Sequence, residues 1–429
     1  MEFKKSVIII GGGWSGIGVA GSFAYNNFDD YILLEQTDCI GGFWKYHTYD
    51  SVRMHDLSRL YKTPHHLLEK YKDHFLLQSE VPMYLQQYAE HYGISNHVIF
   101  TLKVTQISNQ EDEEFCWRVT GINLIEDVER TYICKYLCIA TSYCRVPHIP
   151  ENIMKSMDRF KRKIIHSVDY KNPSTFDISK HRKILIIGGG HSSAEISTEL
   201  TDAGFHVTIA HRGGQYFMRQ HDWTPYLWNQ TIEKSLQYWG YSMADEKFKE
   251  ILNTFDEQFS EKIYHINNKV NWTIPLLRPA SFIILHKKTF IDDSHFFDLL
   301  RQKSIEVKGT VREIVEEGVI FENRFEIQEF DGIILCTGFS HGLEQFLDNA
   351  NQYLSNHRYR HLPPEKACLP ITDGRCKSFT KNNLYFPGFD YGINQRVDFA
   401  LYSWYVGERI LSDIMGNDFI PELSPSKFK

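Results

Sequence analysis

The feature that most constrains this chain is a short apolar run that leads directly into a glycine-rich turn near the N-terminus. Residues 7–10 read Val-Ile-Ile-Ile, which predicts a strand buried on both faces. The turn is Gly11-x-Gly13-x-x-Gly16, and a helix is expected over residues 17–24. In this order the first glycine permits a tight turn, the second lets a pyrophosphate approach the backbone, and the third lets the helix pack on the strand. The pattern predicts a dinucleotide-binding loop with the phosphates at the helix N-terminus.

A second copy of this pattern lies in the middle of the chain. Residues 183–187 read Lys-Ile-Leu-Ile-Ile and lead into Gly188-x-Gly190-x-x-Ser193, and a helix is again expected to follow. Each copy is then followed by another apolar strand, expected over residues 31–34 and 205–210. The repetition predicts two dinucleotide sites in one chain.

The two copies differ in the charge that ends the following strand. Glu35 lies 24 residues after Gly11, and Arg212 lies 24 residues after Gly188. A carboxylate hydrogen-bonds the ribose of a dinucleotide and repels a 2′-phosphate, whereas a guanidinium group binds that phosphate. We therefore predict that FAD binds at the first loop and NADPH at the second.

Further candidates lie near the ends of other expected elements. Gly42 lets backbone lie close to a flat ligand, and Trp44 either covers that ligand or packs in the core. Thr141 and Thr337 each end an apolar strand and precede a small residue. Gln395 lies near the start of a helix whose dipole can point at a flavin. The predicted FAD residues are Gly11, Gly13, Ser15, Gly16, Glu35, Gln36, Gly42, Trp44, Val104, Thr141 and Gln395. The predicted NADP residues are Gly188, Gly190, His191, Ser192, Ser193, Arg212, Thr337 and Gly338.

Composition excludes several classes of function. The 429 residues carry 47 Lys and Arg against 54 Asp and Glu, a net charge of −7, so no basic surface for nucleic acid or anionic lipid is expected. No apolar run reaches the roughly 18–20 residues that span a bilayer, and a cytoplasmic location is expected. The eight cysteines contain no C-x-x-C pair, which argues against a zinc site or a dithiol redox centre, and no metal is predicted. The sequence leaves a homodimer open.

These patterns predict an α/β protein with two Rossmann-like domains, each a three-layer ββα arrangement. The FAD-binding domain is expected over residues 1–150 and 326–429. An NADPH-binding domain over residues 151–325 is inserted between them and carries an aromatic-rich insertion over residues 214–300. Further helices are expected over residues 81–92, 245–263, 292–303 and 397–415, with a strand over residues 98–107 and irregular structure over residues 41–64.

The residues quoted so far resemble the flavin-containing monooxygenase superfamily. Between its two glycine loops that family carries F-x-G-x-x-x-H-S-x-x-[YF]. This chain matches that pattern at Phe160, His166, Ser167 and Tyr170, with Arg162 in place of the glycine. The stretch 38–44, together with residues 49–50, 54–55 and 64, is also similar to the plant YUCCA flavin monooxygenases.

The resemblance implies an enzyme in which NADPH reduces FAD, O2 gives a C4a-(hydro)peroxyflavin, and one oxygen atom passes to a small-molecule substrate. Baeyer–Villiger members usually carry Trp where this chain has Tyr170, which favours N- or S-oxygenation. The alternative is carbonyl-directed oxygenation, either Baeyer–Villiger or YUCCA-like oxidative decarboxylation of a 2-oxo acid. The missing C-x-x-C pair argues against a disulfide reductase, and a non-enzymatic flavin-binding or redox-sensing protein is a further alternative.

Four positions depart from the family pattern or have two interpretations. His55 stands where many members carry an asparagine thought to contact the flavin peroxide, and it is the predicted catalytic residue. The alternative for His55 is packing against the flavin ring. His166 either acts at the site or hydrogen-bonds backbone at a domain junction. Ser142 replaces a glycine, which on sequence alone is a conservative change, and His191 replaces the usual asparagine.

Overall fold

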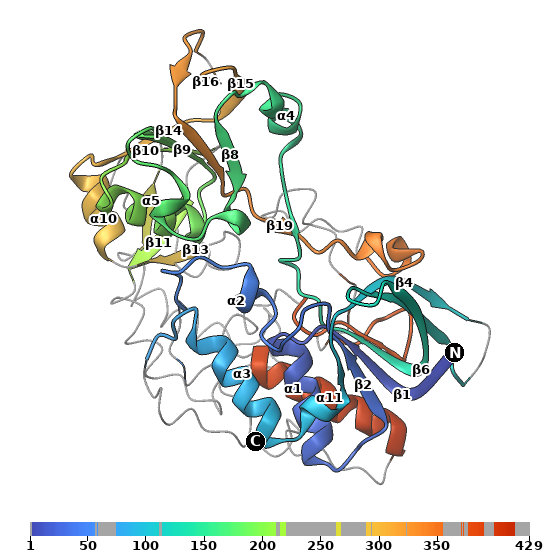
Figure 1. Cartoon of the computed structure of the whole chain (residues 1–429). Helices are drawn as coiled ribbons and strands as arrows, with labels where there is room; N and C mark the ends of the chain where they lie inside the picture. Colours follow the sequence, from blue (N-terminus) through green and yellow to red (C-terminus); the bar gives the residue numbers. More distant parts are fainter. Residues whose placement is uncertain are drawn as a thin grey trace, which may run out of the picture.

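The chain contains two large sheets, one mixed and one parallel, that lie at opposite ends of the molecule (Figure 1). The computed structural model describes residues 2–55, 58, 74–110, 114–211, 215–219, 263–266, 289–292, 294–322, 324–354, 370, 372, 376–389 and 399–416. The predicted site residues Arg212 and Gln395 and the helix expected over residues 245–263 lie outside the described residues, as does most of the insertion expected over residues 214–300.

The first sheet has the strand order β3-β2-β1-β6-β5-β4, with β20 also paired to β6. Strand β1 pairs in parallel with both β2 and β6, whereas β5 runs antiparallel to β4 and β6. The strands are β1 (Glu2–Ile10), β2 (Tyr31–Leu34), β3 (Val98–Ile99), β4 (Leu102–Asn109), β5 (Trp117–Asn123), β6 (Val128–Ile139) and β20 (Leu384–Tyr385).

Both faces of β1 are covered, as its run of apolar residues predicts. Val7 and Ile9 belong to a core shared with the helices α1 (Trp14–Tyr25), α3 (Glu80–His91) and α11 (Phe399–Met415). Ile8 and Ile10 belong to a core on the opposite face, which includes residues of β4 and β5. Small residues let the helices approach: a Cβ atom on Gly21 would lie 2.0 Å from the Tyr88 hydroxyl oxygen.

The second sheet has the strand order β14-β10-β9-β18-β8, and all its neighbouring strands are parallel. Helices α5 (His191–Asp202) and α10 (Ser294–Arg301) contribute to the core on one face. The small antiparallel sheet β15-β16-β17 contributes to the core on the other face. The strands are β8 (Lys163–His166), β9 (Lys183–Ile187), β10 (His206–Ala210), β14 (Ile305–Lys308), β15 (Val311–Val315), β16 (Gly318–Phe321), β17 (Gln328–Glu329) and β18 (Gly332–Leu335).

These sheets confirm the predicted α/β class and correct one detail of the predicted division. Strand β18 lies after residue 325, where the inserted domain was expected to end, yet it pairs with β8 and β9 of the second sheet. That sheet therefore continues beyond the predicted boundary. A third sheet of β11 (Gln215–Arg219), β12 (Ile263–Ile266) and β13 (Thr289–Asp292) lies within the range predicted as an insertion.

Two short strands connect the halves of the molecule. Strand β7 (Val146–Pro147) pairs antiparallel with β19 (Phe339–Ser340), and Figure 1 shows β19 between the two main sheets. The Arg145 guanidinium donates to the carbonyl of Gly342 over 3.1 Å. The two segments that lead into and out of the second half are therefore bonded to each other.

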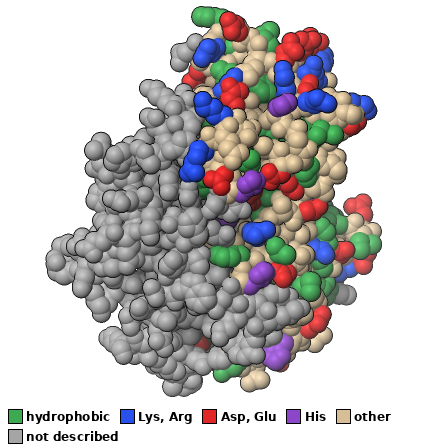
Figure 2. Space-filling view, turned by 90° about the vertical axis from the view of Figure 1, so that its left-hand side faces the viewer, with side chains coloured by type: hydrophobic (Ala, Val, Ile, Leu, Met, Phe, Trp, Pro, Cys, Tyr) green, Lys and Arg blue, Asp and Glu red, His purple; other side chains and the backbone are tan. Residues whose placement is uncertain are grey.

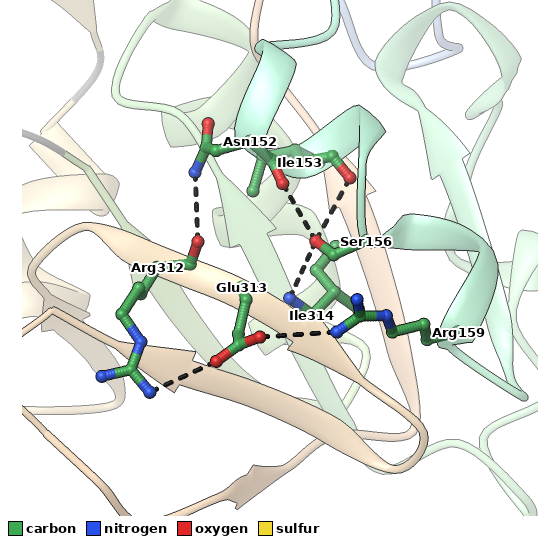
Figure 3. A network of polar contacts seen from close by, with 7 residues as sticks. All are labelled: Asn152, Ile153, Ser156, Arg159, Arg312, Glu313 and Ile314. Atoms are coloured by element: carbon green, nitrogen blue, oxygen red, sulfur yellow. Dashed lines mark hydrogen bonds and ion pairs between the residues drawn. The ribbon is translucent and has the colours of Figure 1, made fainter.

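The leading segment is then fixed to the second half by a polar network around Ser156 (Figure 3). Helix α4 (Glu151–Met154) and a 3-10 turn over Met157–Arg159 flank this serine. The buried Ser156 hydroxyl accepts from the backbone N–H of Ile314 at 3.1 Å and donates to the carbonyl of Asn152 at 3.0 Å. The Asn152 amide in turn donates to the carbonyl of Val311 over 3.1 Å. Strand β15 is thus tied to the connection between the halves.

Several smaller elements complete the description. The expected helices over residues 81–92, 292–303 and 397–415 correspond to α3, α10 and α11, with ends shifted by one to two residues. The strand expected over residues 98–107 was wrong as a single strand, because Thr101 adopts a φ of 55° and separates β3 from β4. The remaining elements are the one-turn helix α2 (Phe43–Tyr46) and 3-10 turns at Ile94–His97, Ser167–Asp169, Pro173–Thr175, Leu343–Gln345 and Ala350–Gln352.

The described residues contain neither a membrane-spanning helix nor a disulfide. None of the helices in the described ranges is long and apolar enough to cross a membrane. No disulfide joins the seven cysteines that the described part of the chain contains. Figure 2 shows that acidic and basic side chains are intermixed over the described part of one face.

The Ser156 network gives a first prediction. Ser156→Ala leaves the buried N–H of Ile314 without its acceptor, so the free energy of unfolding should fall by about 1–3 kcal/mol. The matched control is Arg159→Ala, which removes only an exposed ion pair to Glu313 and should cost less than about 0.5 kcal/mol. Chemical denaturation of both variants measures the difference, and equal losses would contradict the assignment.

Candidate functional site

The two glycine loops lie at corresponding places in the two main sheets. In the first sheet the chain proceeds from β1 to β2 on one side, while β6 pairs on the other side. In the second sheet β9 stands between β10 and β18 in the same way. Ligands of open α/β sheets bind outside the carboxyl ends of the strands at such a change of direction. Both predicted loops begin at that point.

Close backbone contacts explain the glycines of the first loop. Gly11 has a φ of 108°, and a Cβ atom there would lie 2.8 Å from the carbonyl oxygen of Ala140. A Cβ atom on Gly16 would lie 1.9 Å from the carbonyl oxygen of Gly11. Helix α1 is therefore pressed onto the end of β1, as the sequence pattern predicts.

The second loop has a serine where the first loop has its third glycine. Gly188 has a φ of 136°, and a Cβ atom there would lie 2.1 Å from the carbonyl oxygen of Cys336. Ser193 stands where the first loop has its third glycine, and its hydroxyl donates to the carbonyl of Gly188 at 2.9 Å. The Gly188 carbonyl, which corresponds to the Gly11 carbonyl of the first loop, thus accepts a hydrogen bond from the serine.

Both helices that follow the loops begin without a protein cap. The N-cap residues are Gly13 for α1 and Gly190 for α5, and no side chain caps either helix within the described chain. The first turn of each helix also contains no acidic residue. The leading N–H groups and the positive end of each helix dipole are consequently suited to an anion such as a pyrophosphate.

Glu35 lies at the end of β2 and is held by three protein donors. Its Oε2 accepts from the Gly12 backbone N–H at 2.6 Å. Its Oε1 accepts from both the backbone N–H and the hydroxyl of Thr37, each at 2.8 Å. The carboxylate is 5% exposed, so its orientation beside the first loop is fixed. Contact with a ribose stays a prediction.

Gly42 brings a second backbone segment against the same loop. Its φ is 55°, and a Cβ atom there would lie 2.7 Å from the Cα atom of Gly13. Trp44, two residues later, packs against the helix-side cores of both halves. The structure therefore supports the packing interpretation of Trp44, and its contact with a flavin stays a prediction.

The two strands that end in threonine differ in one hydrogen bond. The Thr337 hydroxyl donates to the carbonyl of His148. The corresponding Thr141 hydroxyl oxygen is buried and has no hydrogen-bond partner among the described residues. A buried hydroxyl without a partner is costly, so this oxygen at the first loop fits a polar group of a bound ligand.

The residues after these threonines share a left-handed backbone. Gly338 has a φ of 85° and Ser142 a φ of 65°. This conformation costs an L-residue about 1–2 kcal/mol relative to glycine. The Ser142 hydroxyl accepts from the Cys144 N–H at 3.3 Å, which offsets part of that cost. The change from glycine to Ser142, which the sequence alone indicates is conservative, is therefore not conservative for the backbone.

The side chain of the predicted catalytic residue His55 lies against helix α5 of the second half. Its ring stacks on His191 with centroids 3.8 Å apart and 17° between the planes. Its Nε2 lies 2.6 Å from Oε1 of Glu195, and the Tyr49 hydroxyl donates to the other oxygen of the same carboxylate. The structure thus brings His55 together with the second loop. Glu195 and Tyr49 were not predicted as site residues, although Glu195 follows His191 at the i, i+4 spacing of one helix face.

The motif between the loops is bonded to several segments of the second half. The ring Nδ1 of His166 accepts from the N–H of Val168, and its Nε2 lies 3.0 Å from the carbonyl oxygen of Gly338. The backbone-bonding interpretation of His166 is therefore confirmed. The buried Tyr170 donates to Glu199 of α5 at 2.9 Å, and Arg162, which replaces a family glycine, donates to the carbonyl of Phe330 at 2.7 Å.

The remaining predicted residues make no side-chain contact that defines their role. Ser15 is close to Gly388, where an added Cβ atom would lie 2.6 Å from the Ser15 hydroxyl oxygen. Gln36 follows Glu35 at the end of β2, and Val104 lies in β4 with its side chain in the core. Among the described residues, no group of three or more His, Cys, Asp and Glu is arranged to hold a metal ion.

Comparisons with known proteins agree with this geometry. A model of the flavin-binding monooxygenase-like family matches residues 4–365. Flavin-containing monooxygenase 5 of Oryctolagus cuniculus is 22% identical over 361 residues, which cover 82% of this chain and 65% of that protein. The chain therefore spans slightly less than two thirds of the length of that relative.

Two further similarities cover almost the full length of both partners. The probable indole-3-pyruvate monooxygenase YUCCA10 of Arabidopsis thaliana is 22% identical over 379 residues, covering 88% of this chain and 93% of that protein. The structure of a flavin-containing monooxygenase from Stenotrophomonas maltophilia superposes with a TM-score of 0.65 at 16% identity. That superposition covers 96% of this chain and 99% of the other, and it shows a common fold.

The backbone at Ser142 gives the second prediction. Ser142→Gly should change the free energy of unfolding by less than about 1 kcal/mol, because relief of strain offsets the lost hydrogen bond and the added chain entropy. Ser142→Val loses the same hydrogen bond but places a β-branched residue at positive φ, so it should cost about 2 kcal/mol or more. Thermal and chemical unfolding compare the two variants. Equal effects would show that the positive φ is not a constraint.

Proposed function

Because the chain belongs to the flavin-binding monooxygenase-like family, we propose that it is an FAD- and NADPH-dependent monooxygenase. It transfers one oxygen atom of O2 to a small-molecule substrate. The observation that supports this most is the pair of uncapped helices behind glycine loops, each at the change of strand direction in its sheet. FAD is assigned to the first loop and NADPH to the second.

The residues around the first loop fit a flavin dinucleotide. Gly11 and Gly16 bring backbone against backbone, so the pyrophosphate can approach the N-terminus of α1. Glu35 is fixed where a ribose hydroxyl would meet its carboxylate. The buried hydroxyl oxygen of Thr141 lacks a partner among the described residues and is available to a polar flavin atom. When bound, FAD supplies the chemistry of O2 reduction, for which amino-acid side chains have no equivalent.

The chain's own residues then bind, orient and move protons. The N-terminus of α5, with Ser192 and His191, holds the phosphates of NADPH. Thr337 and Gly338, which follow the end of β18, border that site. Because Nε2 of His55 is engaged by Glu195, Nδ1 is the atom at which this ring accepts or releases a proton. Trp44 packs against the cores of both halves, where its indole would limit the access of water to a bound flavin.

For the substrate we propose N- or S-oxygenation of a soft nucleophile such as an amine or a thioether. Tyr170 supports this choice, because Baeyer–Villiger members usually carry Trp at the corresponding position of the motif. The second candidate is carbonyl-directed oxygenation, either Baeyer–Villiger or decarboxylation of a 2-oxo acid. The likeness to a probable indole-3-pyruvate monooxygenase over 93% of that protein favours it.

A substrate screen tests the activity and separates the two candidates. Thioethers and tertiary amines are compared with ketones and indole-3-pyruvate, while NADPH consumption is corrected for hydrogen peroxide release. Mass spectrometry then looks for products that have gained one oxygen atom. N- or S-oxides support the first candidate, and esters or a decarboxylated acid support the second. Yellow protein that NADPH cannot reduce without air would contradict the proposed enzyme and favour a flavin-binding protein.

The assignment of the two loops gives the third prediction. Gly16→Ser forces a Cβ atom against the Gly11 carbonyl oxygen, so the purified protein should bind FAD about tenfold more weakly or worse. Ser193→Gly removes only the hydroxyl that meets the Gly188 carbonyl, and it should retain the flavin. The flavin absorbance per mole of protein measures both. Loss of flavin in the Ser193 variant alone would reverse the assignment.

Arg212 gives the fourth prediction, which concerns the choice of nicotinamide cofactor. A guanidinium group binds the 2′-phosphate that distinguishes NADPH from NADH, and a contact between charged groups contributes about 1.5–3 kcal/mol. Arg212→Ala should therefore raise KM for NADPH by about tenfold or more and change KM for NADH little. Steady-state kinetics with both cofactors measure this, and equal increases would rule out the proposed contact.

A further inference from the structure

Helix α5 holds the His55 ring through a carboxylate that no motif indicates. Glu195 lies one turn after His191 on the same face of the helix. One oxygen of Glu195 lies 2.6 Å from Nε2 of His55, and the other accepts a hydrogen bond from the Tyr49 hydroxyl. Tyr49, Glu195 and His55 therefore form one continuous set of hydrogen bonds.

Donor and acceptor capacity fixes the direction of these bonds. An ionised carboxylate only accepts, so Tyr49 and Nε2 of His55 both donate to Glu195. Burial and the neighbouring Glu195 carboxylate raise the pKa of Tyr49 well above its ordinary value, so the phenol stays protonated and remains a donor.

The ring of His55 is held on two sides. Glu195 fixes the Nε2 edge, and the stack on His191 fixes the plane. The side chains of His55 and Glu195 are only 26% and 16% exposed, so water screens their interaction incompletely. Both contacts come from α5, although His55 itself belongs to the first half of the chain. The position of the first turns of α5 therefore sets the position of this ring.

We propose that Glu195 and Tyr49 are positioning residues that hold the His55 ring as the Nε2–H tautomer. This inference rests on the proposed function, in which His55 handles a proton. Tyr49 donates to one oxygen of Glu195 and fixes the carboxylate, whose other oxygen lies against Nε2 of His55. Nδ1 is then the ring atom left to accept a proton.

The neighbouring turn of α5 supplies a matched control. Tyr170 donates to Glu199 at 2.9 Å, in the same way that Tyr49 donates to Glu195. Tyr170 is fully buried, and its ring packs edge-on against Tyr49 with centroids 6.1 Å apart. Among the described contacts, the bond from Tyr170 to Glu199 has no link to His55. Tyr170→Phe therefore removes an equivalent tyrosine–carboxylate bond while leaving the proposed chain complete.

The test is NMR of the histidine ring nitrogens in the FAD-containing protein. The protein carries ¹⁵N-labelled histidine, and His55→Asn identifies the His55 signals by their loss. Wild type is compared with Glu195→Ala, Glu195→Gln, Tyr49→Phe and Tyr170→Phe. Circular dichroism and bound flavin check that each variant is folded.

In wild type we expect a protonated Nε2 and an unprotonated Nδ1. Glu195→Ala should lower the ratio of the Nε2–H to the Nδ1–H tautomer by about tenfold, because the charged acceptor is lost. Tyr49→Phe should lower this ratio by a smaller factor, because Glu195 keeps its charge but loses the bond that fixes it. Tyr170→Phe should leave the ratio unchanged. If Glu195→Ala does not fold, Glu195→Gln keeps an uncharged acceptor and should give a smaller decrease in the same direction.

Other results overturn the inference. An unchanged tautomer ratio in folded Glu195→Ala would reduce Glu195 to a structural role. A decrease in Tyr170→Phe as large as that in Tyr49→Phe would show that any nearby bond has the same effect. The tautomer comparison needs neither NADPH nor turnover, so it tests Glu195 separately from the proposed function.

Discussion

The contact between the first glycine loop and its helix is the constraint on which the first half of the molecule depends. Helix α1 can lie against β1 only because Gly16 has no side chain to meet the Gly11 carbonyl. That position lets α1 cover one face of the sheet and pack in turn against α3 and α11. It also leaves the N-terminus of α1 at the carboxyl end of β1, where an anion can reach its free N–H groups.

Helix α5 has a second role that its twin α1 does not share. Besides presenting its N-terminus, it offers two carboxylates one turn apart, Glu195 and Glu199, to tyrosines from other parts of the chain. Tyr49 and His55 come from the segment after the first glycine loop, whereas Tyr170 comes from the motif before the second. The helix therefore joins three segments, and the family motif over residues 160–170 contributes to that junction.

The connection between the halves is built from backbone bonds and two anchoring side chains. Gly338 offers one carbonyl to both the N–H of His148 and the ring of His166, and the pairing of β7 with β19 follows directly. Ser156 then ties the leading segment to β15 from the other side. Because these bonds lie close to the ends of β18 and β8, the orientation of the connecting segments is set by the second sheet.

Sequence by itself determined the features that depend on neighbouring residues. The strand, glycine turn and helix of both loops follow from periodicity and from backbone sterics within about ten residues. Glu35 and Arg212 are identified as corresponding residues of opposite charge, because each lies at the same spacing after the first glycine of its loop. Tertiary structure alone decided the partners of His55, since Glu195 is distant in the chain and reaches Tyr49 and His55 only after the halves pack. It also placed β18 in the second sheet and Ser142 at positive φ, because strand pairing and backbone closure depend on residues far apart in the sequence.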